Sequence, residues 1–431
     1  MRSKELGAKR VWSTTGVVAL TGALLLTSAP TASADYVRDQ QWVLDAFRMQ
    51  DTWAVTQGEG VTVAVVDSGV DASHPDLTGQ VLEGKDFTGG GNAQEDLFGH
   101  GTSMASIIAG HGHGAKNESG MVGFAPKAKI LPLRAIQKKS DDFEDETWAE
   151  AVHYAVDKGA KVINLSFGDS HSRTLSEGRE AIAYAQAHDV VVVASSGNEG
   201  ILALNEPAGL PGVVSVGAVD KYANVWEKSN SGKGLTLVAP GVDIVAANKH
   251  KSNGYSLADG TSAATAYVSA TAALVRAKYP DLTAGQVINR LIKSASFLDH
   301  KGLKAPDREY GYGIIRPNKA LTMDIPEGPK EGPLGKVQQQ SSTSNSGNAS
   351  DGNNSSAPQA KQKSSSGSIF VIAGIAAVVV IAGIAIAVIR SRRNRGNGGP
   401  GRPGGGYPNH SSCPPAGTPH NPGNANSYQR P

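Results

Sequence analysis

The chain has 431 residues, of which 39% are hydrophobic and 19% charged, proportions typical of a globular protein with a packed core. The formal net charge of +2 is too small to indicate a nucleic-acid partner. The single cysteine, Cys413, excludes an internal disulfide and any metal site built from several cysteines, so the chemistry must use oxygen and nitrogen groups.

The N-terminal segment has the order of a secretory signal peptide. Basic residues precede an apolar run over residues 11–26, and small residues end at Ala32-Ser33-Ala34. A run this short, followed by an A-x-A site, is typical of a cleaved signal, and the alternative is an uncleaved anchor. We expect residues 1–34 to be the signal peptide and the mature chain to begin near Asp35.

The region from residue 35 to residue 323 alternates apolar runs with helix-like segments. Runs that are apolar at nearly every position are typical of strands buried on both faces of a parallel sheet. This alternation predicts a doubly wound α/β domain, with helices on both faces of a mostly parallel sheet. The predicted strands are 61–66, 129–133, 161–165, 190–193, 213–216 and 235–238. The predicted helices between them include about 145–158 and 177–187.

Three reactive side chains stand at the ends of predicted elements. Asp67 follows the first strand, where a dinucleotide-binding fold would instead show G-x-G-x-x-G. His100 begins one small-residue helical segment in Gly-His-Gly-Thr, and Ser262 begins another in Gly-Thr-Ser-Ala. Serine becomes a nucleophile when a neutral imidazole takes its proton and a carboxylate orients that imidazole. The three residues indicate a nucleophilic triad, although each alone also fits a helix cap or a turn.

A fourth side chain fits the same chemistry. Asn198 lies in Ser-Gly-Asn-Glu-Gly, directly after a strand of consecutive valines. An amide in that place can donate a hydrogen bond to a developing oxyanion, and the loss of one such donor costs about 3–4 kcal/mol of transition-state stabilisation. A turn residue without function is the alternative interpretation.

In this order, Asp, His and Ser resemble the subtilisin-like serine proteases. The resemblance extends from about residue 53 to residue 321, and it includes four further landmarks in the right order. These landmarks are His74-Pro75-Asp76-Leu77, Gly123-Phe124-Ala125-Pro126, Ala239-Pro240-Gly241 and Tyr310-Gly311-Tyr312-Gly313. Each motif is weak alone, but the ordered set is specific.

The resemblance implies a role for each residue. Asp67 orients the imidazole, and His100 acts first as general base and then as general acid. Ser262 attacks the substrate carbonyl, and Asn198 serves the oxyanion hole. Ser103 stands in a segment that looks more like the family's nucleophile motif. Because it follows His100 by three residues, we interpret it as part of the histidine helix.

Two positions depart from the family pattern. Ala266 stands where the family usually has a proline, four residues after the nucleophile. Asp169 follows Ser166, Phe167 and Gly168 where a second glycine is common. By the resemblance, residues 166–168 bind substrate by pairing with its extended backbone, and a carboxylate at 169 would favour basic or polar substrate side chains.

The composition changes in the C-terminal quarter of the chain. Residues 324–368 are rich in Pro, Gly, Ser, Gln and Asn, and predict a disordered linker. Residues 369–389 contain no charge, and a helix of that length spans about 31 Å, the thickness of a bilayer core. Basic residues follow at once, which marks the cytoplasmic side. We expect a transmembrane helix and a disordered cytoplasmic tail over 390–431.

The organisation of the chain resembles that of the mycosins, which are membrane-anchored subtilisin-like proteases associated with type VII secretion. The shared features are a short N-terminal extension, a linker, one membrane span and a cluster of basic residues directly after the span. The resemblance implies a serine endopeptidase held at the cell membrane, with its catalytic domain outside the cytoplasm and a protein or peptide as substrate. The alternative is an assembly component of a secretion complex in which proteolysis is incidental. A generic anchored subtilisin is a further possibility.

The sequence implies no required cofactor and no metal site. The acidic residues over 141–146 complement the dipole of the following helix, although a calcium site or selection of basic substrates would also fit. His111 and His113 lie in a glycine-rich turn, and two histidines without a third ligand favour solvated side chains over a metal site.

Overall fold

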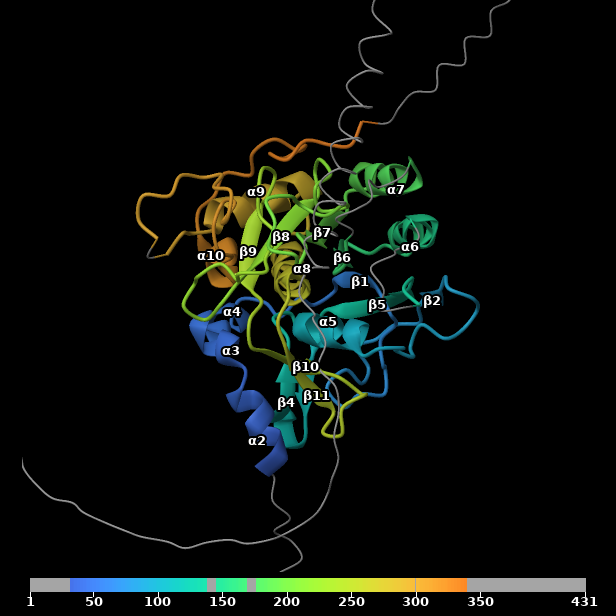
Figure 1. Ribbon diagram of the computed structural model, residues 1–431. Coiled ribbons are helices and arrows are strands. Elements are labelled where there is room, and N and C mark those ends of the chain that lie inside the picture. Colours follow the sequence, from blue (N-terminus) through green and yellow to red (C-terminus); the bar gives the residue numbers. More distant parts are fainter. Residues whose placement is uncertain (1–31, 138–144, 169–175, 299, 339–431) are drawn as a thin grey trace, which may run out of the picture. The chain divides into compact units, whose positions relative to one another are not determined.

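A computed structural model describes residues 32–137, 145–168, 176–298 and 300–338 (Figure 1). The expected transmembrane segment, most of the expected signal peptide and the expected tail lie outside these residues. Within the described ranges, no helix combines the length and the apolar character that a membrane crossing needs.

A seven-stranded sheet, in the order β2-β5-β1-β6-β7-β8-β9, forms the centre of the fold. All neighbouring strands pair in parallel, which confirms the predicted α/β class. Two hairpins, β3–β4 and β10–β11, lie outside this sheet. The strands are β1 (Thr62–Asp67), β2 (Lys85–Asp86), β3 (His111–His113), β4 (Ser119–Val122), β5 (Lys129–Arg134), β6 (Val162–Leu165), β7 (Val191–Ser195), β8 (Val214–Val219), β9 (Leu237–Pro240), β10 (Ile244–Ala247) and β11 (Tyr255–Ala258).

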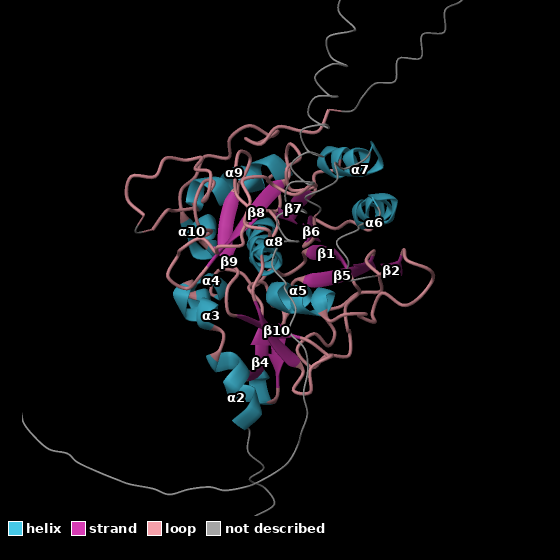
Figure 2. Ribbon diagram, in the orientation of Figure 1, coloured by secondary structure: helices cyan, strands magenta, loops and turns pink. Residues whose placement is uncertain are grey.

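Helices cover both faces of the sheet (Figure 2). Val63 and Val65 of β1 point into a core shared with α5, α8 and α9, whereas Ala64 and Val66 point into a core shared with α6 and α7. Burial on both faces explains why the central strands are apolar at most positions. The helices are α2 (Ala32–Asp39), α3 (Trp42–Ala46), α4 (Met49–Trp53), α5 (His100–Ala109), α6 (Asp145–Asp157), α7 (Ser176–Ala187), α8 (Thr261–Lys278), α9 (Ala284–Ser294), α10 (Pro317–Thr322) and the short 3₁₀ helix η1 (Ala115–Asn117).

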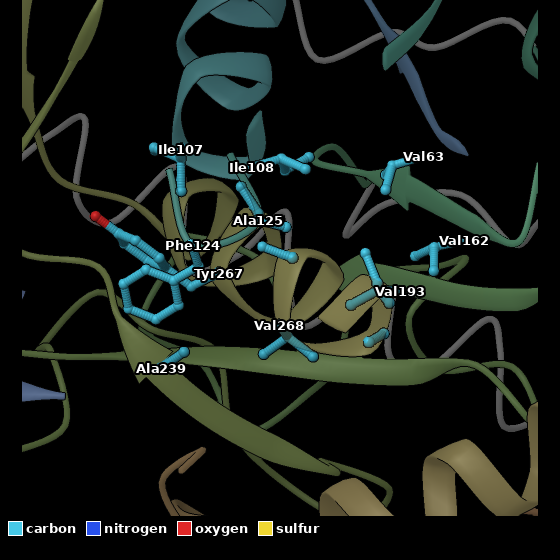
Figure 3. Packing of buried hydrophobic residues seen from close by; sticks show 14 of the residues in the cluster. Val63, Ile107, Ile108, Phe124, Ala125, Val162, Val193, Ala239, Tyr267 and Val268 are labelled. Carbon is cyan, nitrogen blue, oxygen red and sulfur yellow. The ribbon is translucent and has the colours of Figure 1, made fainter. Parts of the chain in front are cut away.

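Helix α8 is the buried centre of the larger core. Figure 3 shows Tyr267 and Val268 of this helix among side chains from the sheet and from α5. The ring of Tyr267 lies 4.5 Å from that of Phe124, centroid to centroid, and burial raises the pKa of the Tyr267 phenol above its usual value. Ala266, at the position of the family's proline, is fully buried within the uninterrupted helix. Such dense packing makes α8 a rigid support for the residues at its start.

The N-terminal helices dock against the body of the domain. The side chain of Gln41 is buried, and it both donates to the carbonyl of Val122 at 2.8 Å and accepts from its N–H at 3.0 Å. The indole of Trp53 donates to the carbonyl of Phe124 at 2.9 Å. These hydrogen bonds satisfy backbone N–H and carbonyl groups in and after β4. The N-terminal helices α2 to α4 therefore form part of the folded domain.

The linker prediction is wrong at its beginning, because residues 324–338 pack against the domain. We call this segment the C-terminal strap. Arg290 of α9 donates to the carbonyls of Met323 at 2.6 Å and Ile325 at 3.3 Å. Asn289 donates to the carbonyls of Pro326 and Glu327, both at 3.1 Å. Side chains of α9 thus hold the strap through its backbone, which composition alone does not reveal. Residues 339–368 lie outside the described part.

Candidate active site

Three adjacent strands bring candidate residues to one edge of the sheet. Val66 of β1 pairs with Leu165 of β6, and Leu165 pairs with Ala194 of β7. The residues that follow these positions therefore leave the sheet side by side at its carboxyl edge, where α/β proteins place their active sites. Asp67, Ser166 and Asn198 follow in these three segments.

Asp67 and His100 form a close pair. Nδ1 of His100 lies 2.9 Å from each carboxylate oxygen of Asp67. The carboxylate is fully buried, whereas the His100 side chain is 41% exposed. An ionised carboxylate can only accept, so the ring donates from Nδ1, and in the neutral imidazole Nε2 is left as the proton acceptor. This tautomer suits a general base.

The first turn of α5 is held close to the segment after β1, which brings His100 to Asp67. Gly101 lies so close to the segment after β1 that a Cβ there would come within 2.0 Å of the carbonyl oxygen of Gly69. The buried carboxylate of Asp96 accepts hydrogen bonds from the N–H groups of Gly99 and Thr102, both at 2.8 Å. Sequence reasoning missed Asp96, although an acidic residue just before a helix is a capping signal.

Ser262 is the second residue of α8 and is bonded reciprocally to Ser166. Its hydroxyl donates to the carbonyl of Ser166 at 2.9 Å, and the Ser166 hydroxyl donates to the carbonyl of Ser262 at 3.1 Å. The amide of Asn164 donates to the Ser166 hydroxyl at 2.9 Å and accepts from Ser269 at 3.0 Å. This buried chain ties the end of β6 to the start of α8, and the packing of α8 against α5 joins the helix of Ser262 to that of His100.

The side-chain amide of Asn198 is oriented by α8. Its Oδ1 accepts from the backbone N–H and from the hydroxyl of Thr261, both at 2.9 Å. A backbone N–H can only donate, so the carbonyl end of the amide faces Thr261 and the NH₂ end faces away. Asn198 is exposed, and Nδ2 has no hydrogen-bond partner among the described residues. Asn198 is thus fixed beside Thr261, the residue before Ser262, with its amide donor directed away from Thr261.

The predicted substrate-binding segment turns its side chains inward. Ser166 is buried, and Phe167 is buried with its ring 6.1 Å from that of Trp148. Gly168 has no space for a side chain, because a Cβ would lie 2.8 Å from the Cβ of Asn205. Substrate contact at 166–168 can thus involve only the main chain, and it stays a prediction. Asp169 lies outside the described residues.

Ser103 is a structural residue of α5. Its buried hydroxyl donates toward the carbonyls of Gly99 and Ala247, each at 2.8 Å. A serine that is held this way between two backbone acceptors has no route to substrate, which agrees with its interpretation as part of the histidine helix.

The described residues contain no group of three or more His, Cys, Asp or Glu side chains that could hold a metal. His113 instead pairs with the buried carboxylate of Asp76 at 2.5 Å, and His111 lies 2.9 Å from the carbonyl of Thr78. The acidic residues 141–144, at which a calcium site was the alternative prediction, lie outside the described part.

Comparison with known proteins places this geometry in a family. The subtilase family profile matches residues 58–313, more than half of the chain. The chain belongs to the subtilase family. It is 40% identical over 253 residues to the thermophilic serine proteinase of Bacillus sp. (strain AK1), covering 58% of this chain and 61% of that protein. It is 34% identical over 248 residues to thermitase of Thermoactinomyces vulgaris, covering 57% and 85%.

Among the curated relatives, the chain spans 61% of the Bacillus proteinase and 46% of fervidolysin of Fervidobacterium pennivorans. Solved structures of mycosins match over more of their length. MycP1 with its N-terminal propeptide removed gives a TM-score of 0.59 at 31% identity, covering 67% of this chain and 99% of that one. MycP3 of the type VII (ESX-3) secretion system gives 0.55 at 30%, covering 65% and 88%.

Proposed function

We propose that the protein is a serine endopeptidase that cleaves peptide bonds through an acyl-enzyme. The hydrogen bond between the buried Asp67 and His100 carries the proposal, because it sets the imidazole up to accept a proton at Nε2. Nε2 takes the proton of the Ser262 hydroxyl while Oγ attacks the substrate carbonyl carbon. The imidazolium, stabilised by Asp67, then gives that proton to the leaving amine.

The second half of the reaction uses the same groups. Water enters in place of the amine, His100 takes one of its protons, and the water oxygen attacks the acyl carbon. The bond between that carbon and Oγ of Ser262 then breaks, His100 returns the proton to Oγ, and a carboxylic acid leaves. In both steps the substrate oxygen carries negative charge, and Nδ2 of Asn198 is the proposed side-chain donor to it. The N–H of Thr261 is bound to Asn198, but the N–H of Ser262, also in the first turn of α8, has no intrahelical acceptor and is a proposed second donor. No cofactor is required, and activity is expected to survive a metal chelator.

A fluorophosphonate probe tests the assignment of the nucleophile. The purified protein is expected to be labelled on Ser262 and to lose labelling in Ser262→Ala. Ser103→Ala serves as the matched control, since Ser103 also lies near the start of a buried helix, and its labelling is expected to persist. A folded wild-type protein that is not labelled, or a Ser262→Ala protein that still is, would count against the proposal.

We infer from the likeness to MycP1 and MycP3 that the biological setting is type VII secretion. Either proteolysis or the folded domain itself could be what the secretion complex needs. A deletion strain complemented with Ser262→Ala separates these roles: failure to restore secretion favours the peptidase, and full rescue favours the assembly role.

We also propose anchorage in the cell membrane, with the peptidase domain outside the cytoplasm. The signal-like N-terminus and the uncharged residues 369–389 with their basic flank support it. Membrane fractionation, followed by protease treatment of intact spheroplasts, tests the arrangement. The domain is expected to be degraded while an epitope at Pro431 is protected, and the opposite pattern would reverse the topology.

A further inference from the structure

The turn that carries Asn198 is held by a residue far away in the sequence. Asn230, in the connection between β8 and β9, is fully buried. Its Oδ1 accepts from the backbone N–H groups of Glu199 and Ile201, both at 3.1 Å. Its Nδ2 donates to the Glu199 carboxylate at 2.6 Å and to Oδ1 of Asn205 at 3.0 Å. Both lone pairs and both hydrogens of this amide are therefore used.

The backbone of Asn230 also forms hydrogen bonds with the same turn. Its N–H donates to the carbonyl of Gly197 at 3.0 Å, and its carbonyl accepts from the Ser196 hydroxyl at 2.9 Å. Gly197 has a φ of 114°. A Cβ at that position would lie 2.2 Å from Nδ2 of Asn230, so the turn closes directly onto the amide. Residues on either side of Asn198 are thus fixed by one buried side chain and its backbone.

Asn198 itself has a single described anchor, the hydrogen bonds from Thr261 to its Oδ1. Those bonds set which end of the amide faces Thr261, and the Thr261 hydroxyl also lies 3.3 Å from the carbonyl of Gly197. Asn230 holds the backbone on both sides of Asn198, through the carbonyl of Gly197 and the N–H groups of Glu199 and Ile201. Because a displacement of about 1 Å can cost roughly 100-fold in rate, the rigidity of this turn matters for any donor that Asn198 supplies.

We propose that Asn230 is a positioning residue that places Asn198 in the oxyanion hole. The inference rests on the proposed peptidase function and extends it to a residue that does not touch substrate. The required side chain is a neutral amide, since two donors and two acceptors converge on it. Aspartate has nearly the same shape, but it lacks both donors and places a second carboxylate against Glu199.

Kinetics of Asn230→Ala test the role. An oxyanion donor acts in the transition state, so misplacing it is expected to lower kcat by about 10- to 100-fold and to leave KM within about twofold. Asn289→Ala is the matched control, because Asn289 is also a buried asparagine that clamps a loop, the C-terminal strap. It is expected to lower the melting temperature without this kcat effect. Labelled casein detects activity, and a peptide cut from it supplies kcat and KM.

A swap of chemical groups tests the hydrogen-bonding argument. Asn230→Asp is expected to be at least as impaired as Asn230→Ala, because two carboxylates then face each other. Adding Glu199→Gln restores a hydrogen bond between the two positions with the roles exchanged. The amide at position 199 then donates, and the carboxylate at position 230 accepts. The double variant is expected to recover at least about tenfold in kcat over Asn230→Asp, which loss of packing alone would not produce. No recovery would overturn the requirement for a matched amide.

Hydrogen exchange separates this inference from the proposed function. The N–H groups of Glu199 and Ile201 are expected to exchange at least about tenfold faster in Asn230→Ala than in the wild type, whatever the protein catalyses. Unchanged exchange, or a kcat equal to that of Asn289→Ala, would overturn the role of Asn230 alone. Wild-type activity that does not depend on Ser262 would overturn the peptidase proposal and the oxyanion role with it.

Discussion

Asp96 accepts a 2.7 Å hydrogen bond from the hydroxyl of Ser68, the residue that follows Asp67. Through its other carboxylate oxygen, Asp96 accepts from the N–H of Thr102 at 2.8 Å and from its hydroxyl at 2.6 Å. One buried carboxylate thus holds both the segment after β1 and the first turn of α5. These are the two elements that the hydrogen bond between Asp67 and His100 joins, so Asp96 sets their separation.

Asp96→Asn is expected to lower the free energy of unfolding by about 2–4 kcal/mol, because an NH₂ group would face donors in a buried place. A looser Asp67–His100 pair should also lower kcat, by about tenfold. Chemical denaturation and peptide hydrolysis measure the two effects. The partly exposed Asp71 caps a neighbouring turn, and Asp71→Asn should change both by much less. Equal effects of the two variants would contradict a special role for Asp96.

Asp67→Asn is expected to lower kcat by about 10,000-fold with little change in KM. The amide can present a donor to Nδ1, which favours the imidazole tautomer with its proton on Nε2, and that tautomer cannot act as a base. Initial rates on a cleaved peptide measure the loss, and circular dichroism verifies the fold. Activity of the variant within tenfold of the wild type would show that the pair with His100 is structural.

A buried ion pair should make stability depend on pH. Burial alone would raise the pKa of Asp86, but hydrogen bonds from Arg134 and Thr88 outweigh it and hold the pKa well below its usual range. The unfolded chain therefore binds this proton more readily. The stabilisation is present at neutral pH and is lost as the pH falls below about 4, the ordinary value for aspartate.

Asp86→Asn is expected to cost about 3 kcal/mol at pH 7, and the difference from the wild type should shrink toward pH 3. Urea denaturation at several pH values measures this. The exposed pair of Arg48 with Asp51 gives the control, since Asp51→Asn should cost less than about 1 kcal/mol at any pH. A penalty for Asp86→Asn that does not change with pH would contradict the mechanism.

The C-terminal strap should detach when Arg290 is removed. Besides its carbonyl contacts, the guanidinium lies 4.2 Å from the ring centroid of Tyr279. Arg290→Ala leaves these carbonyls without their partner, and trypsin cleavage after Lys330 is expected to accelerate by at least about tenfold. Arg308→Ala, at an exposed position, should leave the cleavage rate unchanged. Equal rates in both variants would show that the strap is held by other contacts.

Much of the architecture could be predicted because its signals are local. A strand buried on both faces is apolar at most positions, so the runs that form β1, β6 and β7 could be recognised in the sequence. Asp67, His100 and Asn198 stand at element ends, where short motifs around each residue reveal them. Parallel strand order then brings Asp67 and Asn198 to one edge of the sheet, whereas the place of His100 depends on the packing of α5 against β1.

The supporting residues could not be predicted in this way. Asn230 bonds to Glu199 across 31 positions, and Asn164 bonds to Ser269 across 105. Nothing in the residues around Asn230 or Asn164 marks such a partner, because a hydrogen bond between distant segments depends on where packing brings them. The strap over residues 324–338 was mistaken for a free linker for the same reason: its order comes from side chains of α9 that bind its backbone. The sequence by itself therefore determined the strands and the reactive side chains, because their signals lie within a few residues. Only tertiary packing decided which residues hold those side chains in place.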